Sequence, residues 1–340
     1  MYRLLGEAMM KMSNEPLFLE PYFQEKIWGG DRLHTEYGYQ IPSDHTGECW
    51  AISAHTHGPA IVENGPYKGL TLTEVWDKHR EVFGNAKGDV FPLLTKILDA
   101  KADLSVQVHP DDAYAKEHEG ELGKTECWYV LAADKGAQMY YGHHAKTREE
   151  LAEMIENKQW DKLLRKISVK AGDFLYVPAG TIHAIGKGIM VLETQQSSDT
   201  TYRLYDFDRI DKATGKKREL HLKRSIDVTN VPHVDPKLDI QTTVTGDKKV
   251  TRFVDTDFFA VYKWEIAGSA TFERQQVPYT LVSVLDGNGQ LEVEGRTYEL
   301  KKGMHFILPY AVKSWTLAGK MMLIASEPGK KHDQSQAALK

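Results

Sequence analysis

Four side chains in the sequence have the chemistry to bind a single metal ion: Gln107, His109, Glu126 and His183. Residues 105–109 alternate as a β-strand does, so Gln107 and His109 point to the same face of that strand. Two imidazoles, a carboxylate and an amide oxygen suit Zn²⁺ or another divalent first-row ion. With one water as a fifth ligand, such a site keeps an exchangeable position, so the sequence predicts a metal centre that a substrate can reach.

The segment 172–183 predicts how His183 is positioned. Its pattern, G-x5-P-x-G-x2-H, indicates a short strand, a Pro-Ala-Gly turn and a histidine on the next strand. Gly172 and Gly180 supply the backbone freedom that sharp reversals need. We therefore expect this imidazole at the mouth of a β-barrel, where a metal ion could use it.

The same spacing recurs at residues 303–314. There Ala311 replaces the second glycine, and Ser314 stands at the position of the histidine. Because both copies lie in β-rich halves of the chain, we interpret them as an internal duplication. The second copy has lost its ligand, so we expect a second barrel that binds no metal and supports or covers the first.

Other histidines compete with this assignment. A lone histidine in a β-protein is most often a surface residue or a hydrogen-bonded core residue. His55 and His57 share one strand face but have no close carboxylate, whereas His143 and His144 are adjacent and would point to opposite faces of a strand. Neither pair matches the four-ligand set, so we favour the first assignment.

Composition excludes several classes of function. The 340 residues carry a net charge of -5, with 27% charged and 41% hydrophobic residues, which disfavours a nucleic-acid or membrane surface as the main partner. Two cysteines, Cys49 and Cys127, cannot form a disulfide framework, which favours a reducing compartment. No run of 18 apolar residues is present, and residues 1–12 lack a signal-peptide pattern. We expect a cytoplasmic protein with a small-molecule partner.

Hydrophobic alternation predicts a mainly β fold with a few inserted helices. The clearest helix is expected at about 147–165. We predict a catalytic domain over 17–235, a C-terminal domain without metal ligands over 245–326, and flexible tails at 1–16 and 327–340. The strand patterns lie at residues 47–62, 91–108, 126–141, 167–192 and 251–326. Weaker helical patterns lie at residues 71–83, 111–119 and 218–231.

The motifs resemble those of a known family. The pattern at 172–183 is similar to the second half of the cupin motif, and the chain from about residue 17 to about residue 326 resembles type I phosphomannose isomerases in their short bacterial form. This resemblance implies two cupin-like jelly-roll β-barrels. It is carried by seven stretches, residues 25–30, 47–53, 91–96, 107–112, 123–128, 178–184 and 193–203.

The resemblance implies a zinc-dependent aldose–ketose isomerase that interconverts mannose 6-phosphate and fructose 6-phosphate through an enediol. It implies one Zn²⁺ per chain on Gln107, His109, Glu126 and His183, with Arg203 as a catalytic residue. The substrate pocket that it implies is lined by Lys96, Ser105, Lys124, Asp199 and Arg209.

The chain departs from the family pattern at three places. Longer members carry a larger helical domain where this chain has only residues 147–165, and they carry a tyrosine where Ile185 stands. The cupin motif would also place an asparagine where Lys187 stands. The way in which the site closes around its substrate is therefore expected to differ from that of longer members. No phenol is expected to act at position 185.

The implied reaction assigns chemical roles to some of these residues. The C2 proton of the open-chain sugar is weakly acidic, so the site must stabilise negative charge on the sugar oxygens. The permanent charge of Arg203 suits that role better than acid–base work. The sequence leaves the general base open between Lys96, Lys124 and Glu126. The phosphate is expected to meet Ser105 together with Lys96, Lys124 or Arg209.

Two other functions stay open. A different cupin enzyme, such as a non-haem iron oxygenase, would favour a histidine-rich ligand set, whereas Gln107 and the nearby cations fit an anionic sugar better. A non-catalytic sugar-phosphate-binding protein would have a degenerate site, and the complete ligand set together with Arg203 argues against it. The sequence is compatible with a monomer or a homodimer.

Overall fold

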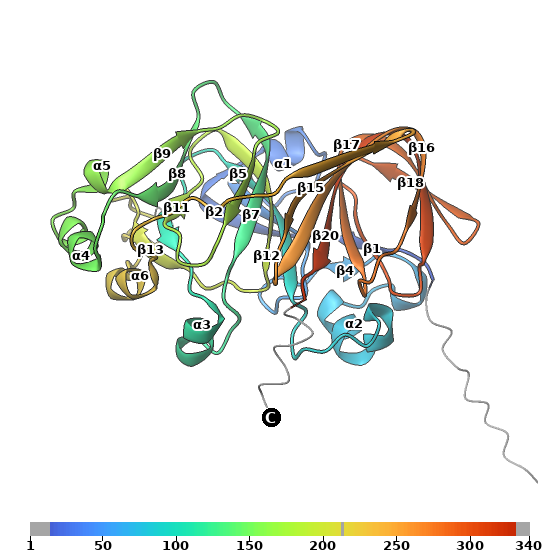
Figure 1. Ribbon diagram of the computed structural model, residues 1–340, viewed down its shortest axis with the longest axis horizontal. Coiled ribbons are helices and arrows are strands. Elements are labelled where there is room, and N and C mark those ends of the chain that lie inside the picture. Colours follow the sequence, from blue (N-terminus) through green and yellow to red (C-terminus); the bar gives the residue numbers. More distant parts are fainter. Residues whose placement is uncertain (1–13, 212–213, 331–340) are drawn as a thin grey trace, which may run out of the picture.

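The computed structural model describes residues 14–211 and 214–330, which form a mainly β protein with short helices at its edges (Figure 1). The predicted fold class is confirmed in this respect. The described strands form three antiparallel sheets, and each of these sheets is open instead of closing into a complete barrel. No helix of these two ranges is long and apolar enough to cross a membrane.

Two sheets pack face to face and position the predicted metal ligands. Trp128 and Leu98 of the six-stranded sheet share one buried core with Met139 and Tyr141 of the five-stranded sheet. The six-stranded sheet has the order β10 (Phe174–Val177), β7 (Glu126–Ala133), β12 (Ile189–Gln196), β5 (Leu93–Ala100), β2 (Tyr22–Gly30), β3 (Thr46–Ile52). The five-stranded sheet has the order β13 (Tyr202–Tyr205), β6 (Val106–Val108), β11 (His183–Ala184), β8 (Gln138–His143), β9 (Leu164–Ser168).

The third sheet has nine strands and contains the C-terminal part of the chain, drawn in orange and red in Figure 1. Its long strands surround a second core that includes Trp264, Phe306 and Trp315. Its order is β14 (Gln241–Thr245), β15 (Lys248–Asp255), β16 (Phe259–Glu273), β20 (Ser314–Pro328), β17 (Thr280–Val293), β19 (His305–Leu308), β1 (Leu17–Glu20), β4 (Ile61–Val62), with β18 (Arg296–Lys301) beside β17.

The strands β1 and β4 link the two halves of the molecule. Both lie within the range predicted for the first domain, yet Phe18 of β1 pairs with Phe306 of β19, and Leu19 of β1 pairs with Val62 of β4. The first of the described strands, β1, thus belongs to the same sheet as the C-terminal strands. The division into domains at 17–235 and 245–326 stays a prediction, and these two strands cross it.

The recurrence of the glycine–proline pattern has a direct structural counterpart. Gly172 and Gly303 both have positive φ, at 91° and 89°. Each glycine precedes a four-residue strand, β10 in the first copy and β19 in the second. The next strand then begins at His183 in the first copy and at Ser314 in the second. The two copies therefore have the same local fold, and only the first delivers an imidazole at the end.

The helices are short and lie at the edges of the sheets. Instead of the single helix predicted at 147–165, the chain forms two helices and enters β9 at Leu164. The break falls at Lys158, whose φ of 52° is left-handed and cannot continue a right-handed helix. The helices are α1 (Arg32–Thr35), α2 (Leu72–Lys78), α3 (Asp112–His118), α4 (Arg148–Glu156), α5 (Trp160–Leu163) and α6 (Leu222–Val228), with 3₁₀ turns η1 (Gly65–Tyr67) and η2 (Arg80–Phe83).

The predicted tails are too long at both ends. At the C-terminal end β20 continues to Pro328, which pairs with Phe259, and the buried Glu327 accepts a hydrogen bond from Thr280. At the N-terminal end Asn64 donates a hydrogen bond to the carbonyl of Pro16. Pairing with β16 at one end and the contact with Asn64 at the other thus fix residues that were predicted to belong to the tails, while 1–13 and 331–340 lie outside the described residues.

Candidate active site

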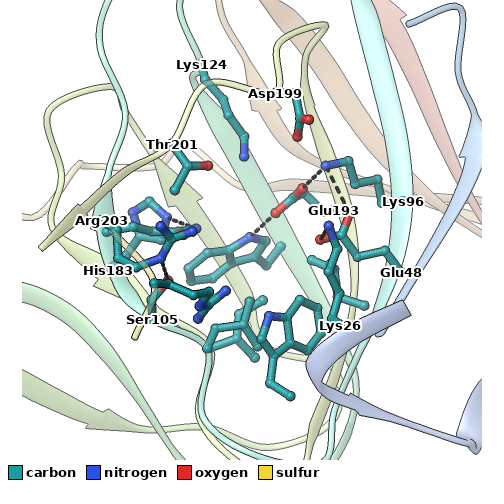
Figure 2. A pocket seen from close by; sticks show the side chains of 17 residues that line it. Lys26, Glu48, Lys96, Ser105, Lys124, His183, Glu193, Asp199, Thr201 and Arg203 are labelled. Atoms are coloured by element: carbon teal, nitrogen blue, oxygen red, sulfur yellow. Dashed lines mark hydrogen bonds and ion pairs between the residues drawn. The ribbon is translucent and has the colours of Figure 1, made fainter. Parts of the chain in front are cut away.

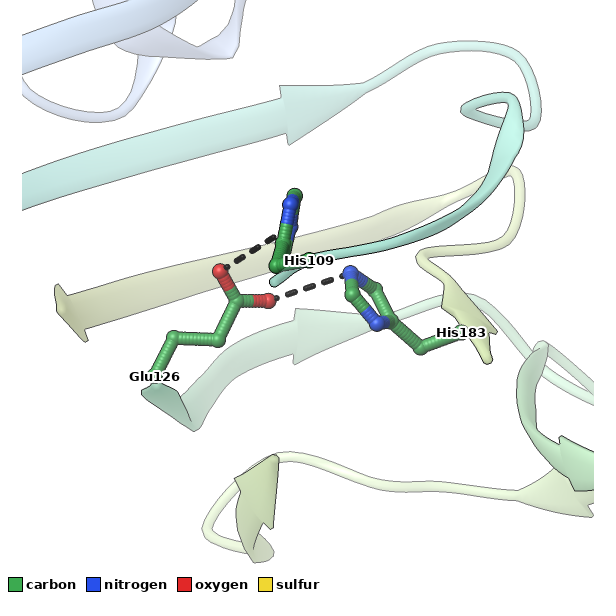
Figure 3. Close-up of side chains that lie close together, drawn as sticks. All are labelled: His109, Glu126 and His183. Atoms are coloured by element: carbon green, nitrogen blue, oxygen red, sulfur yellow. Dashed lines mark ion pairs between the residues drawn. The ribbon is translucent and has the colours of Figure 1, made fainter. Parts of the chain in front are cut away.

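His109, Glu126 and His183 meet in the first half of the molecule (Figure 3). His109 follows β6, Glu126 opens β7 and His183 opens β11, so three strands from two sheets each contribute one side chain. Glu126 Oε2 lies 3.5 Å from Nε2 of His109, and Glu126 Oε1 lies 3.2 Å from Nε2 of His183. Among the residues that the structure describes, these three are the one group of histidine and acidic side chains close enough to share an ion.

The Pro-Ala-Gly turn fixes His183 in this position. The N–H of Gly180 donates to the carbonyl of His109 at 2.8 Å, which ties the turn to the end of β6. Gly180 has a φ of 83°, and a Cβ there would lie 2.5 Å from the side chain of Asn230. Only glycine satisfies both the left-handed backbone and this close contact.

Hydrogen bonds fix the tautomers of both histidines. Nδ1 of His109 lies 2.9 Å from the carbonyl of Thr200, and Nδ1 of His183 lies 2.9 Å from the carbonyl of Thr181. A carbonyl oxygen only accepts, so each Nδ1 carries the proton and each Nε2 presents a lone pair to Glu126.

The resulting group of atoms fits a cation. Nε2 of His109 and both carboxylate oxygens of Glu126 are buried and have no hydrogen-bond partner. Burial lowers the pKa of His109 well below its usual range and that of His183 to about 4, so neither ring supplies a proton at neutral pH. Apart from the ammonium of Lys124, which lies 3.4 Å from Glu126 Oε2, these buried acceptors face one another without a donor, and such an arrangement is costly. A divalent ion bound by nitrogen and oxygen would satisfy all of them.

Gln107 lies at the edge of this group. It is opposite His183 in the β6–β11 pairing, and its side-chain nitrogen lies 3.4 Å from Nε2 of His183. The oxygen and nitrogen of an amide exchange places by a simple flip, so the same position can present an oxygen. The structure therefore brings together all four predicted ligands.

A cavity of 320 Å³ opens beside the metal-ligand group (Figure 2). Of the residues predicted to bind substrate or act in catalysis, Lys96, Ser105, Lys124, Asp199 and Arg203 line it, as do the ligands Gln107 and His183. Five cationic and three acidic side chains are among its lining residues, which favours an anionic ligand. The other lining residues are Lys26, Trp28, Glu48, Leu98, Leu104, Trp128, Ile185, Glu193, Thr201 and Arg218.

Arg209 differs from its prediction, because it does not line this cavity. Its guanidinium donates to the carboxylate and the carbonyl of Asp206 and to the carbonyl of Asp103, and it lies over the ring of Phe207. These contacts turn Arg209 toward the wall behind the cavity. Arg218, which comes later in the chain, lines the cavity instead, together with Arg203.

Two buried carboxylates in the cavity wall were missed by the sequence analysis. Glu193 accepts a hydrogen bond from the indole of Trp128 at 2.9 Å, and Glu48 accepts one from the indole of Trp50 at 2.6 Å. Between them lies Nζ of Lys96, 4.0 Å from Glu193 and 3.6 Å from Glu48 (Figure 2). For Glu193 the sequence signal was a glutamate that directly follows the four apolar residues 189–192 of the same strand.

The two carboxylates differ in acidity. Burial raises the pKa of Glu193 to about 7, and the negative charge of Glu126 adds to this effect. Burial alone would also raise the pKa of Glu48, but Lys96 and Lys26 lower it to about 2. Near neutral pH, Glu193 is therefore able to take up and release a proton, whereas Glu48 stays ionised.

The lysine closest to the metal ligands is held in its charged form. Nζ of Lys124 lies 3.4 Å from Glu126. Burial would lower the pKa of Lys124, but Glu126 and Glu193 together raise it above its usual value. Lys124 is thus a poor candidate for the general base.

Arg203 lies next to the metal-ligand group on the neighbouring strand. In the β13–β6 pairing it is opposite Gln107, and its Nε donates to the hydroxyl of Ser105 at 3.3 Å. Nη1 donates to the carbonyl of Glu219 at 2.9 Å. This places a fixed cation between the metal ligands and the hydroxyl of Ser105.

The competing histidines have other partners. His55 and His57 contact each other, and they lie 3.9 Å from Glu121 and 3.3 Å from Asp199 respectively. Within residues 14–211 and 214–330 they do not belong to a group of three possible ligands. His143 contacts the carbonyl of Asn230 through Nε2, as a hydrogen-bonded core histidine does.

Comparison with known proteins places this site in a family. Residues 17–132 match the catalytic domain of type I phosphomannose isomerases, and residues 249–328 match the cupin domain of mannose-6-phosphate isomerases. The chain is 59% identical to the mannose-6-phosphate isomerase of Streptococcus mutans, over 92% of this chain and 98% of that protein. It is 54% identical to the mannose-6-phosphate isomerase of Bacillus subtilis, over 93% and 99%.

A solved structure gives the same result. The crystal structure of the mannose 6-phosphate isomerase from Bacillus subtilis matches with a TM-score of 0.89 at 53% identity, over 92% of this chain and 99% of that one. This match and the cupin-domain match confirm the predicted cupin fold. Fold, motifs and similarity over nearly the whole length agree, and the chain belongs to the type I phosphomannose isomerase family.

Proposed function

We propose that the chain interconverts mannose 6-phosphate and fructose 6-phosphate. The names of its relatives in Streptococcus mutans and Bacillus subtilis support an isomerase of this specificity. The observation that carries the proposal is the group of buried acceptors on His109, Glu126 and His183, which lies beside a cavity with an excess of cationic side chains. Such a cavity suits a small sugar phosphate.

In this proposal one Zn²⁺ per chain is bound by Gln107, His109, Glu126 and His183. Their two imidazole nitrogens, carboxylate and amide match the preferences of zinc, and their buried acceptors fit a cation. When bound, the ion offsets negative charge and polarises oxygen atoms of the sugar.

Glu193 is our candidate for the general base. It lines the cavity, accepts the indole hydrogen of Trp128, and has a pKa near neutral. In the forward direction its carboxylate takes the proton from C2 of the open-chain aldose and returns it to C1. Between these two steps lies an enediol, in which the hydroxyl proton of O2 passes to O1, so that the carbonyl group moves from C1 to C2. Arg203 carries a permanent charge beside Gln107, where it faces the negative charge that develops on the sugar oxygens.

The remaining polar residues hold the sugar in place. Lys96 and Lys124 stay paired with acidic side chains, which balance their charges within the cavity wall. We assign Ser105 to the phosphate and Asp199, on the cavity wall, to a sugar hydroxyl. The enzyme acts on a small metabolite, and we propose that it does so in the cytoplasm.

A coupled assay that follows fructose 6-phosphate formed from mannose 6-phosphate tests the proposal. Zinc-loaded protein should turn over, and the same protein treated with a chelator should lose activity and regain it when zinc is restored. No turnover by the zinc-loaded protein would overturn the proposed function. Oxygen consumption measured in parallel should be absent, which separates this function from that of an oxygenase.

A further inference from the structure

We propose that Arg218 is the cation that binds the phosphate group of the substrate, and that Asp206 positions it. The proposal rests on the proposed function, since it assigns one end of the same cavity. Arg218 stands in none of the matching sequence stretches, yet its side chain lines the cavity. It takes the place that the sequence analysis gave to Arg209.

Asp206 orients two arginines at once. Its buried carboxylate accepts hydrogen bonds from Nε and Nη2 of Arg218, at 2.8 and 2.7 Å, and from Nη2 of Arg209 at 2.5 Å. The side-on pair with Arg218 fixes the plane of its guanidinium and uses only two of its three nitrogens. Nη1 of Arg218 makes no hydrogen bond within the described residues, so it remains for a ligand.

The charge balance also favours an anion here. Two guanidinium groups share the single carboxylate of Asp206, which leaves one positive charge in excess. Lys96 and Lys124, by contrast, lie beside carboxylates of their own. The unbalanced charge of the cavity therefore lies on the side of the arginines, where a phosphate would be stabilised.

The strand register places this pair away from the metal ligands. On β6 and the residues that flank it, the side chains of His109, Gln107 and Ser105 follow one another along one face, at about 7 Å for every two residues. The strand β13 runs antiparallel, with Arg203 opposite Gln107 and Tyr205 opposite Val106. Asp206 follows directly, so it lies toward the Ser105 end of the cavity. A sugar with C1 and C2 at the metal would extend its sixth carbon in that direction.

Substitution of Arg218 tests the proposal. In R218Q the KM for mannose 6-phosphate and the dissociation constant for inorganic phosphate, measured by calorimetry on zinc-loaded protein, should each rise roughly 10- to 100-fold. R218K keeps the charge but loses the planar fork, and should fall between wild type and R218Q. The matched control is K217Q, because Lys217 pairs with Asp208 and does not line the cavity.

The outcomes separate this proposal from the proposed function. If R218Q binds phosphate within twofold of K217Q, or if the wild type binds none, Arg218 is not the phosphate residue. Should the wild type fail to turn over mannose 6-phosphate, the proposed function fails, while the phosphate titration still decides the role of Arg218. If R218Q does not fold, R218K must still show weakened phosphate binding for the proposal to stand.

Discussion

Nε2 of His183 lies 3.2 Å from a carboxylate oxygen of Glu126, and this nitrogen presents a lone pair to that oxygen. The proton of His183 is on Nδ1, which donates to the carbonyl of Thr181. Burial keeps the ring neutral, so the contact is not a salt bridge between opposite charges. Burial raises the pKa of Glu126, and the ammonium of Lys124 acts against this shift. A divalent ion bound to the imidazole nitrogen and the carboxylate would offset the buried negative charge of Glu126.

His183→Ala should remove metal binding and activity together while the fold persists. The variant loses one of two imidazole ligands, and the remaining acceptors cannot complete a four-residue site. Metal analysis should find less than one zinc per chain, and thermal unfolding should no longer respond to added zinc. For wild type, free zinc at 100 times Kd should stabilise by about 2.7 kcal/mol. His143→Ala is the control, because the Nε2 of His143 contacts a backbone carbonyl and the residue lies outside the metal-ligand group, so zinc content should stay unchanged.

Glu193→Gln should lower kcat by about 10²- to 10⁴-fold without loss of zinc, because the amide keeps the shape and cannot take a proton. In the wild type, kcat/KM should fall as pH drops through the pKa of Glu193, at or below about 7, because a base must be deprotonated to act. A bound divalent ion would move this pKa downward by offsetting the charge of Glu126.

Glu48→Gln is the matched control for this pH dependence. Glu48 also accepts an indole hydrogen and contacts Lys96, but its pKa of about 2 keeps it ionised over the whole range. The fall of kcat/KM at low pH should therefore persist in Glu48→Gln. An unchanged pH profile in Glu193→Gln would rule out Glu193 as the base.

Much of the site could be predicted because its geometry is local. The strand alternation at 105–109 places Gln107 and His109 on one face, and the turn before His183 is set by Pro178 and Gly180. Short-range backbone rules decide these features. The recurrence at 303–314 was visible for the same reason.

What the sequence did not reveal depends on partners that are distant in the chain. The proton affinity of Glu193 follows from its burial and from Glu126, which is 67 residues away and on another strand. Arg218 lines the cavity and Arg209 does not, and this difference depends on how each arginine is hydrogen-bonded to Asp206. Likewise, only tertiary packing places β1 in the C-terminal sheet.

Glu48 and Glu193 should give opposite dependences of stability on pH. The pKa of Glu48 lies below its usual 4.5 in the fold, so its contribution is present above 4.5 and is lost as pH falls toward 2. The pKa of Glu193 is raised to about 7, so stability declines as pH rises from 4.5 to 7. Relative to wild type, Glu193→Gln should gain up to about 3 kcal/mol between pH 4 and pH 8.

Urea unfolding of the metal-free protein at several pH values measures both effects. Glu48→Gln should lose up to about 3 kcal/mol at pH 7 and much less at pH 2. A chelator must be present, because a bound ion would itself change both pKa values. Equal stability of Glu193→Gln and wild type at pH 8 would contradict the raised pKa.

Tyr39→Phe should destabilise the protein without changing its catalysis. The hydroxyl of Tyr39 donates to the carbonyl of Gly303 at 2.7 Å and lies 2.8 Å from Nε2 of His305, whose Nδ1 contacts the hydroxyl of Ser283. Burial lowers the pKa of His305 to about 3, so the ring is neutral and Nε2–H donates to Tyr39 while Nδ1 accepts from Ser283. This chain of hydrogen bonds joins the segment after α1 to the second copy of the glycine–proline pattern.

Removal of the hydroxyl takes away the hydrogen-bond partner that Tyr39 provides to the carbonyl of Gly303 and to Nε2 of His305, which should cost about 1–3 kcal/mol of unfolding free energy. Tyr37→Phe is the control, because Tyr37 stacks on Tyr39 and its hydroxyl makes no hydrogen bond within the described residues. Zinc content, kcat and KM should match wild type in both variants, since neither ring lines the cavity. A fall in kcat in Tyr39→Phe alone would mean that the C-terminal sheet also shapes the catalytic cavity, and not merely that it stabilises the fold.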